Sequence, residues 1–456
     1  MELIGTLTPQ ALMPQVKRAL ELASDKTRRI EQRWNTSAGA PVFTARGRYT
    51  ARSWTQWTQG FQYGNALLCF ELTGEQDLLT AARRHVTADM AEHLTHTGVH
   101  DHGFNNISTY GHLRRLMLDG HIERNEWELR FYELALKVSG AVQAARWTSL
   151  KDGLGYIHSF NGNHSLFIDT LRTLRICGLA HVLGHKLLGE QDQSVNLLAR
   201  LLTHAKTSAQ YNIYYGEGRD HYDVPGLRGR TAHEAIFNPA SGVFRCPNSQ
   251  QGYSPFTTWT RGLAWAMLGF AEQLEFILSL PESEFGIEGI PAKSAAAAML
   301  ERAARATCDF YIHQASALDG ICYWDTGAPL LHHLGDWRAC AADPYNDFEP
   351  VDSSASAIAA QGLIRLGHVL ADAGEDYKQA GLTVVARLLQ EPYLSTQTDH
   401  EGLLLHSIYH RPNGWDFIPP SAKIPCGESS MWGDYHLLEV MLLITKLADA
   451  SYYTFF

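Results

Sequence analysis

The chain has 456 residues, of which 45% are hydrophobic and 19% charged, a balance typical of a globular protein with a large core. The formal net charge of −10, without a basic stripe along the sequence, excludes a nucleic-acid partner. No apolar run reaches the length of a membrane-spanning helix, so no membrane partner is predicted either.

The seven cysteines are scattered along the chain, odd in number, and never in a CxxC spacing. This pattern predicts free thiols in a reducing compartment rather than a disulfide framework. Residues 1–9 lack the basic and apolar regions of a signal peptide. We therefore expect a cytoplasmic protein, or a periplasmic one if a leader has been removed, and we predict no oligomeric state.

Helical periodicity dominates the chain, with apolar residues recurring at spacings of three and four. A loop is expected at residues 35–53, and a long irregular insert at 214–256 is expected to hold a short hairpin around 235–246. The predicted helices span residues 10–32, 57–72, 76–96, 104–118, 126–147, 166–183, 194–211, 259–278, 294–313, 354–371, 377–389 and 432–447.

The loops at one end of the predicted helical pairs are long and rich in glycine, aromatic and polar residues, whereas joins at the other end are as short as residues 73–75. Six such hairpins predict an all-α fold, an (α/α)6 barrel in which inner and outer helices form a toroid with a cleft at one face. The alternative is an irregular bundle or a solenoid, although no repeat of about 34 or 40 residues recurs. Because no linker is present, residues 1–456 are expected to form a single catalytic domain.

Tryptophans gather in or beside these elaborated loops. Aromatic faces beside amides and carboxylates bind sugars, because the apolar face of the sugar stacks while its hydroxyls accept and donate hydrogen bonds. The alternative is that the rings fill a large helical core. The residues concerned are Trp54, Trp57, Trp259, Trp265, Trp324, Trp415 and Trp432.

Two carboxylates, Asp101 and Asp169, occupy equivalent places at the starts of two predicted helices. If successive hairpins are neighbours, both point into one cavity. Close carboxylates raise one another's pKa, so one can stay protonated as a general acid near neutral pH. The alternative is that each caps its helix, which contributes about 1 kcal/mol. Asp169 follows a loop rich in Asn, Gly and His, and we interpret it as the catalytic acid.

A third cluster surrounds Arg261 and Trp265, which are four residues apart and share a helix face. A fixed cation beside an aromatic ring suits an anionic sugar such as a uronate. The alternative is a surface arginine beside a buried tryptophan.

The sequence predicts no metal and no cofactor. His181 and His185 have a metal-ligand spacing but lack the glutamate of the HExxH motif, and we interpret them as structural. The chain contains no GxGxxG, Walker or GxSxG pattern, which argues against nucleotide cofactors and serine-hydrolase chemistry.

An ordered set of segments resembles the unsaturated glucuronyl hydrolases, glycoside hydrolase family 88. The set covers most of the chain, and it implies an (α/α)6 barrel without a metal, acting on an unsaturated oligosaccharide. The segments are residues 57–61 (WTQGF), 100–104 (HDHGF), 168–169 (ID), 251–254 (QGYS), 259–265 (WTRGLAW), 352–360 (DSSASAIAA) and 432–435 (WGDY).

The resemblance implies hydration of a 4,5-unsaturated uronate at the non-reducing end of a glycosaminoglycan-type oligosaccharide released by a lyase. Asp169 would protonate C4 of the vinyl ether and guide water to C5, after which the hemiketal opens and releases the next sugar. Asp101 would orient the substrate and tune Asp169. The resemblance also implies substrate contacts by Trp57, His100, Phe160, His233, Gln251, Arg261 and Trp265.

The chain departs from the family pattern in three places. Phe160 stands where the family usually has a tryptophan, and the insert at residues 217–229 is longer than expected. Ser421 and Lys423 loosely resemble a Ser/Lys element that is associated in some members with sulfated substrates, and we include both as candidate substrate-binding residues.

Three other functions remain open at this point. One is an unsaturated rhamnogalacturonyl hydrolase that acts on pectin fragments. Another is a sugar epimerase on the same toroid, which would use paired histidines such as His100, His233 and His406. The third is a noncatalytic sugar-binding module, against which the presence of both Asp101 and Asp169 argues.

Overall fold

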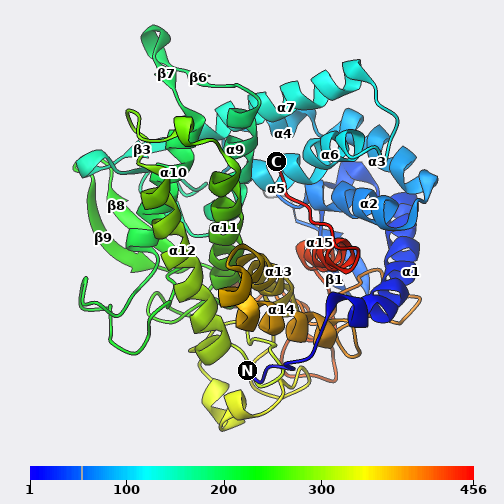
Figure 1. Ribbon diagram of the computed structural model, residues 1–456. Helices are drawn as coiled ribbons and strands as arrows, with labels where there is room; N and C mark the ends of the chain where they lie inside the picture. Colours follow the sequence, from blue (N-terminus) through cyan, green and yellow to red (C-terminus); the bar gives the residue numbers. More distant parts are fainter. Residues whose placement is uncertain (53–54) are drawn as a thin grey trace.

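A computed structural model describes residues 1–52 and 55–456 (Figure 1). Trp54, one of the tryptophans singled out in the sequence, lies outside the described residues together with Ser53. In the part of the chain that is described, no helix is both long and apolar enough to cross a lipid bilayer.

The structure is mostly helical, and every predicted helix has a counterpart. Three predicted helices are divided. The one at 76–96 ends and restarts at Met90, and the one at 104–118 is α5 and α6 joined by a π-helical turn, Ile107–Gly111. The one at 166–183 begins as a short strand before two short helices. The helices are α1 (Pro9–Arg33), α2 (Gln59–Thr73), α3 (Gln76–Asp89), α4 (Ala91–Leu94), α5 (His102–Asn106), α6 (His112–Leu118), α7 (Glu126–Ala145), α8 (Thr170–Thr173), α9 (Arg175–Val182), α10 (Leu197–Tyr211), α11 (Thr260–Ser279), α12 (Lys293–Phe310), α13 (Ser353–Val369), α14 (Glu375–Leu388) and α15 (Met431–Ala448).

The helices fall into a buried set and a half-exposed set. Helix α11 is buried at almost every position, whereas α3 buries only one stripe, which includes Leu78, Ala82 and Val86. The buried helices contact one another in the order α2, α5, α8, α11, α13, α15 and back to α2. Helices α1, α3, α7 and α12 lie around the outside (Figure 1). This order of contacts is consistent with a helical toroid.

The region expected to be a loop at residues 35–53 instead contains a hairpin of β1 (Pro41–Ala45) and β2 (Arg48–Ala51). Its turn residues Arg46 and Gly47 both have positive φ, 53° and 73°, the geometry of the tight turns that connect two-stranded hairpins. The absence of an Asn-Gly or Asp-Gly signal explains why the sequence pattern missed this hairpin.

The hairpin predicted around residues 235–246 is confirmed as β8 (Glu234–Asn238) and β9 (Val243–Asn248). Strand β5 (Ser165–Phe167) pairs with β8, which makes a three-stranded sheet in the order β5-β8-β9. Because β5 immediately precedes α8, this sheet fixes the loop that leads to Asp169. Two smaller antiparallel pairs are β3 (Trp147–Ser149) with β4 (Gly155–Ile157), and β6 (Leu187–Leu188) with β7 (Ser194–Val195).

Candidate active site

Asp101 and Asp169 are brought to the same place by the close packing of α5 against α8. Gly103 permits this approach, since a Cβ on Gly103 would lie 2.2 Å from the carbonyl oxygen of Thr173. The Thr173 hydroxyl also donates a hydrogen bond to the carbonyl oxygen of His100, at 2.8 Å. The expectation that the two hairpins are neighbours is therefore confirmed.

Neither aspartate caps its helix. Asp101 and Asp169 occupy the N-cap positions of α5 and α8, but neither side chain accepts a capping hydrogen bond. Both face His100, whose Nε2 lies 3.0 Å from Oδ1 of Asp169 and 3.8 Å from Oδ1 of Asp101. By contrast, Asp352 caps α13 with hydrogen bonds from the backbone N–H groups of residues 354 and 355. The capping alternative is thus wrong for Asp101 and Asp169.

The three side chains are buried: His100 is 1% exposed, Asp101 6% and Asp169 8%. Burial raises the pKa of Asp101, and the charge of Asp169 raises it further. Burial also acts to raise the pKa of Asp169, but the charge and hydrogen bond of His100 outweigh it, so that this pKa is lowered. The sequence predicted Asp169 as the carboxyl kept protonated, whereas these shifts make Asp101 the weaker acid of the two.

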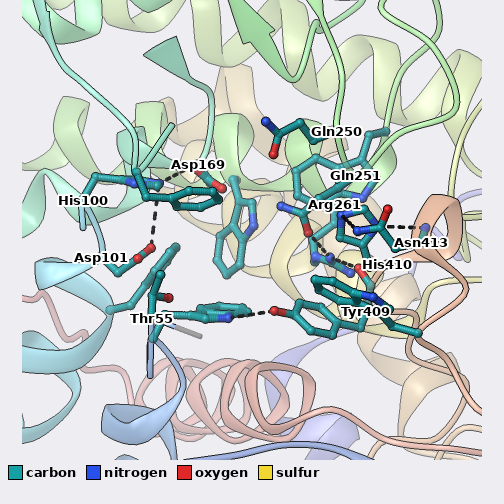
Figure 2. Close-up of a pocket in the computed structure, with 16 residues that line it drawn as sticks. Thr55, His100, Asp101, Asp169, Gln250, Gln251, Arg261, Tyr409, His410 and Asn413 are labelled. Carbon is teal, nitrogen blue, oxygen red and sulfur yellow. Dashed lines mark hydrogen bonds and ion pairs between the residues drawn. The ribbon is translucent and has the colours of Figure 1, made fainter. Parts of the chain in front are cut away.

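These residues form one wall of a cavity that encloses about 670 Å³, part of it open to solvent. Figure 2 shows His100, Asp101 and Asp169 on one side and Gln251, Arg261 and His410 on the other. The lining residues are Thr55, Trp57, His100, Asp101, Phe104, Phe160, Asp169, Gln250, Gln251, Trp259, Arg261, Trp265, Tyr409, His410, Asn413 and Trp415. Eight of the eleven candidate site residues from the sequence are in this set.

Arg261 lies in the cavity wall but is 1% exposed, so it is not the surface arginine of the alternative interpretation. Its guanidinium pairs with Asp352 at 3.1 Å and donates hydrogen bonds to Gln251 Oε1 at 2.9 Å and to the carbonyl oxygen of Tyr409 at 2.7 Å. It also donates to the carbonyl oxygen of Ile408. Arg261 therefore orients Gln251 and the Tyr409 loop. Its positive charge still acts on the cavity, although these contacts occupy its N–H groups.

His233 lies behind the lining residues. Its Nδ1 accepts hydrogen bonds from the backbone N–H groups of Gln250 at 3.0 Å and Gln251 at 3.4 Å. Desolvation by burial lowers its pKa to about 3, so the ring is neutral. The structure therefore places His233 as a support for the turn that carries Gln250 and Gln251.

Aromatic rings form the floor of the cavity. Trp57 stacks on the buried Trp432 with ring centroids 5.1 Å apart, and Trp265 packs against Phe104 at 4.8 Å. Phe160 lies over His100 with centroids 5.8 Å apart. Of the predicted aromatic set, the residues that line the cavity are Trp57, Trp259, Trp265 and Trp415, whereas Trp324 and Trp432 are buried outside the lining.

Sequence reasoning missed the far end of the cavity, formed by Tyr409, His410 and Asn413. These residues lie in a loop held by Asp416, which accepts hydrogen bonds from the backbone N–H groups of Tyr409 and His410. The neighbouring Trp415, which the sequence did single out, was the only signal of this wall.

Ser421 and Lys423 do not join the site. Both are exposed, neither lines the cavity, and Lys423 pairs with Asp347 at 2.6 Å. Within residues 1–52 and 55–456, no group of three or more His, Cys, Asp or Glu side chains is arranged to hold a metal ion. His181, predicted to be structural, pairs with Glu284 at 3.2 Å.

Comparison with known proteins identifies enzymes to which this chain is similar. The unsaturated glucuronyl hydrolase of Bacillus sp. (strain GL1) is 25% identical over 424 residues, 89% of this chain and 90% of that protein. The chain is similar to unsaturated glucuronyl hydrolases. The resemblance predicted from the sequence segments is therefore confirmed, although no protein-family model matches the chain.

Solved structures show that the fold is shared. A crystal structure of an unsaturated glucuronyl hydrolase specific for heparin has a TM-score of 0.72 at 19% identity, covering 96% of this chain and 98% of that one. A Streptococcus agalactiae unsaturated glucuronyl hydrolase variant complexed with dGlcA-GalNAc6S has a TM-score of 0.60 at 18% identity, covering 94% and 90%.

Proposed function

We propose that this protein is a glycoside hydrolase that removes a 4,5-unsaturated uronic acid from the non-reducing end of lyase-generated oligosaccharides of the glycosaminoglycan type. The observation that carries the proposal is the pair of buried carboxylates on either side of His100 in the wall of an aromatic-floored cavity. Similarity to unsaturated glucuronyl hydrolases along 89% of the chain supports the same assignment.

The reaction begins with proton transfer from Asp169 to C4 of the vinyl ether, and positive charge develops at C5 and the ring oxygen. Water then adds to C5 and gives its proton to the Asp169 carboxylate, which restores the acid. The resulting hemiketal opens and releases the neighbouring sugar as an alcohol. Asp101 orients the substrate and, as a second carboxylic group near Asp169, tunes its proton affinity.

The charge distribution of the cavity orients the substrate. A uronate carboxylate is repelled by Asp101 and Asp169, whereas Arg261 and the polar groups of Gln251 and His410 lie on the opposite side (Figure 2). We place the carboxylate of the substrate on that side, with the sugar ring against the floor formed by Trp57, Phe160 and Trp265.

We also propose that the helices form an (α/α)6 barrel within a single domain, residues 1–456. The closed order of contacts among the buried helices supports the barrel. One contiguous apolar cluster that extends from Leu12 to Phe455 supports a single domain. All seven cysteines are unpaired, which supports a reducing, cytoplasmic compartment.

The epimerase alternative receives less support. Of the three histidines named for this alternative, His100 lines the cavity, but His233 and His406 do not. His406 is 1% exposed and accepts a hydrogen bond from the backbone N–H of Gly427.

A panel of unsaturated disaccharides tests the proposal. Products of lyases acting on chondroitin, hyaluronan and heparin, with and without sulfate, are incubated with the protein, and the ultraviolet absorbance of the conjugated enoate is followed. We expect the absorbance to fall with at least one of them, and pectin-derived fragments test the rhamnogalacturonyl alternative. Unchanged absorbance with every glycosaminoglycan product would contradict the proposed function.

A further inference from the structure

We propose that His100 is a positioning residue and not a substrate-binding one. The N–H at its Nε2 hydrogen-bonds to Asp169 and so makes Asp169 the carboxyl that exchanges a proton with the substrate. Asp101 receives no such hydrogen bond. This inference rests on the proposed function for its catalytic consequence. The arrangement of the three side chains carries it, independently of which sugar is bound.

Only one of the two carboxylates is within hydrogen-bond distance of His100. Nε2 lies 3.0 Å from Asp169 and 3.8 Å from Asp101, and the second distance is too long for a hydrogen bond. His100 Nδ1 is buried without a hydrogen-bond partner in the described part of the chain. Because Nδ1 has no acceptor there, the N–H of the ring that is hydrogen-bonded is the one on Nε2, which points at Asp169.

This hydrogen bond makes the two carboxyl oxygens of Asp169 different. Oδ1 accepts the N–H of His100. The proton for C4 is therefore carried by Oδ2, and the carboxylate that remains after the transfer is stabilised by the same N–H. Asp101, which lacks this donor, is the weaker acid of the pair.

The imidazole ring is fixed in place on both sides. Phe160 lies over one face with an interplanar angle of 30°, and Phe167 presents its edge at 86° with centroids 5.6 Å apart. The carbonyl oxygen of His100 accepts the Thr173 hydroxyl hydrogen bond. A ring packed in this way cannot turn to share its N–H with Asp101, so the choice of Asp169 is built into the packing.

Several other titratable groups surround the ring: the two aspartates favour a positive imidazole, and Arg146 opposes it. Burial lowers the pKa of His100 and the two aspartates raise it, with the net shift upward. Among these groups, Asp169 is the one that hydrogen-bonds to the ring. The groups whose charges act on His100, or on which its charge acts, are Asp101, Asp169, Arg146, His158, His204 and His233.

Two substitutions separate positioning from packing. His100→Leu removes the N–H, so Asp169 becomes a weaker acid. We expect the basic limb of the kcat/KM profile to move to higher pH by about one to two units, the effect of losing one donor to a buried carboxylate. We also expect kcat to fall at least about tenfold, because a weaker acid protonates C4 more slowly. His100→Gln keeps a donor near the Nε2 position, and its basic limb should stay within about half a unit of the wild type.

His102→Gln is the matched control. His102 is equally buried, at 1% exposure, but it contacts Ser139 Oγ at 2.9 Å and the carbonyl oxygen of His96 at 3.1 Å instead of the carboxylates. Its substitution should change stability without moving the limb. Two results would overturn the inference. One is a lowered rate in His100→Leu with the basic limb of its kcat/KM profile at the wild-type pH. The other is an equal displacement of that limb in His100→Leu and His100→Gln.

Nitrogen NMR of histidine-labelled protein tests the same arrangement without any substrate. A hydrogen-bonded Nε2–H signal should be present in the wild type, disappear in His100→Gln, and shift in Asp169→Asn more than in Asp101→Asn. A signal that responds only to Asp101→Asn would overturn the inference. If the wild type leaves every unsaturated sugar intact, the proposed function fails while this measurement still decides whether His100 holds Asp169.

Discussion

Gly103 and Thr173 are in contact so close that a Cβ on Gly103 would lie 2.2 Å from the Thr173 carbonyl oxygen. Gly103 is two residues from Asp101, and Thr173 is four residues from Asp169. This backbone contact therefore sets the separation of the two acids. Gly60 has the same relation to the carbonyl oxygen of Asn105, at 2.3 Å, where α2 meets α5.

Replacing Gly103 by alanine should force α5 away from α8. We expect a loss of at least about 2 kcal/mol in the free energy of unfolding, because backbone atoms cannot yield as a flexible side chain can. Urea denaturation measures this loss. Gly189→Ala is the control, since the nearest atom to a Cβ there is 3.7 Å away, and it should change stability by less than about 0.5 kcal/mol. Equal stability of the two variants would mean that the contact does not constrain the helices.

Replacing Asp169 by asparagine should abolish turnover, because the amide can neither give a proton to C4 nor take one from water. We expect a fall in kcat of at least about a thousandfold, with the fold retained, since the substitution preserves the shape of the side chain. Enoate absorbance measures turnover, and circular dichroism with thermal unfolding verifies the fold. A folded variant that keeps wild-type activity would remove Asp169 from the reaction.

Arg261 should behave as part of the framework more than as a simple substrate contact. Arg261→Met leaves Asp352 buried without its cation, and Asp352 is 0% exposed. We expect a loss of about 3–5 kcal/mol in the free energy of unfolding, the range for breaking a buried ion pair. A double-mutant cycle with Asp352→Asn measures the coupling. The sum of the stability losses in the two single variants should clearly exceed the loss in the double variant. Full additivity would show that the pair is not coupled, and a change in KM alone would favour a direct contact with substrate.

The protonation of Asp101 should make stability depend on pH. Burial and the nearby Asp169 raise its pKa in the folded state above that in the unfolded state. A carboxyl of this kind contributes stability at low pH that is lost as the pH rises through its folded pKa. Asp101→Asn has no such group, so its melting temperature relative to the wild type should rise as the pH increases above about 4, the pKa of an unperturbed aspartate. The exposed Glu123→Gln serves as the control. A difference that stays constant with pH would contradict the raised pKa.

The helices could be predicted because each carries its own signal. The buried positions of α1 repeat every three or four residues, and α2 ends at Gly74 in the left-handed conformation that favours glycine. The β1–β2 hairpin could not be predicted in this way. Its stabilisation includes hydrogen bonds from the backbone of residues 46, 47 and 49 to Glu428 and Glu401, which are far away in the sequence.

The sequence by itself determined which hairpins carry the acids and which loops carry the rings, since these depend on local pattern and on the order of the segments. Only the tertiary structure decided which of those residues meet. Arg261 forms an ion pair with Asp352, and His233 supports the Gln250–Gln251 turn. Lys423 lies away from the cavity. His100 stands between Asp101 and Asp169 and hydrogen-bonds to only one. The physical reason is that hydrogen bonds and pKa values change when distances between helices change by a few tenths of an ångström. The packing of groups such as Gly103 and Phe160 sets these distances, and no local sequence pattern encodes them.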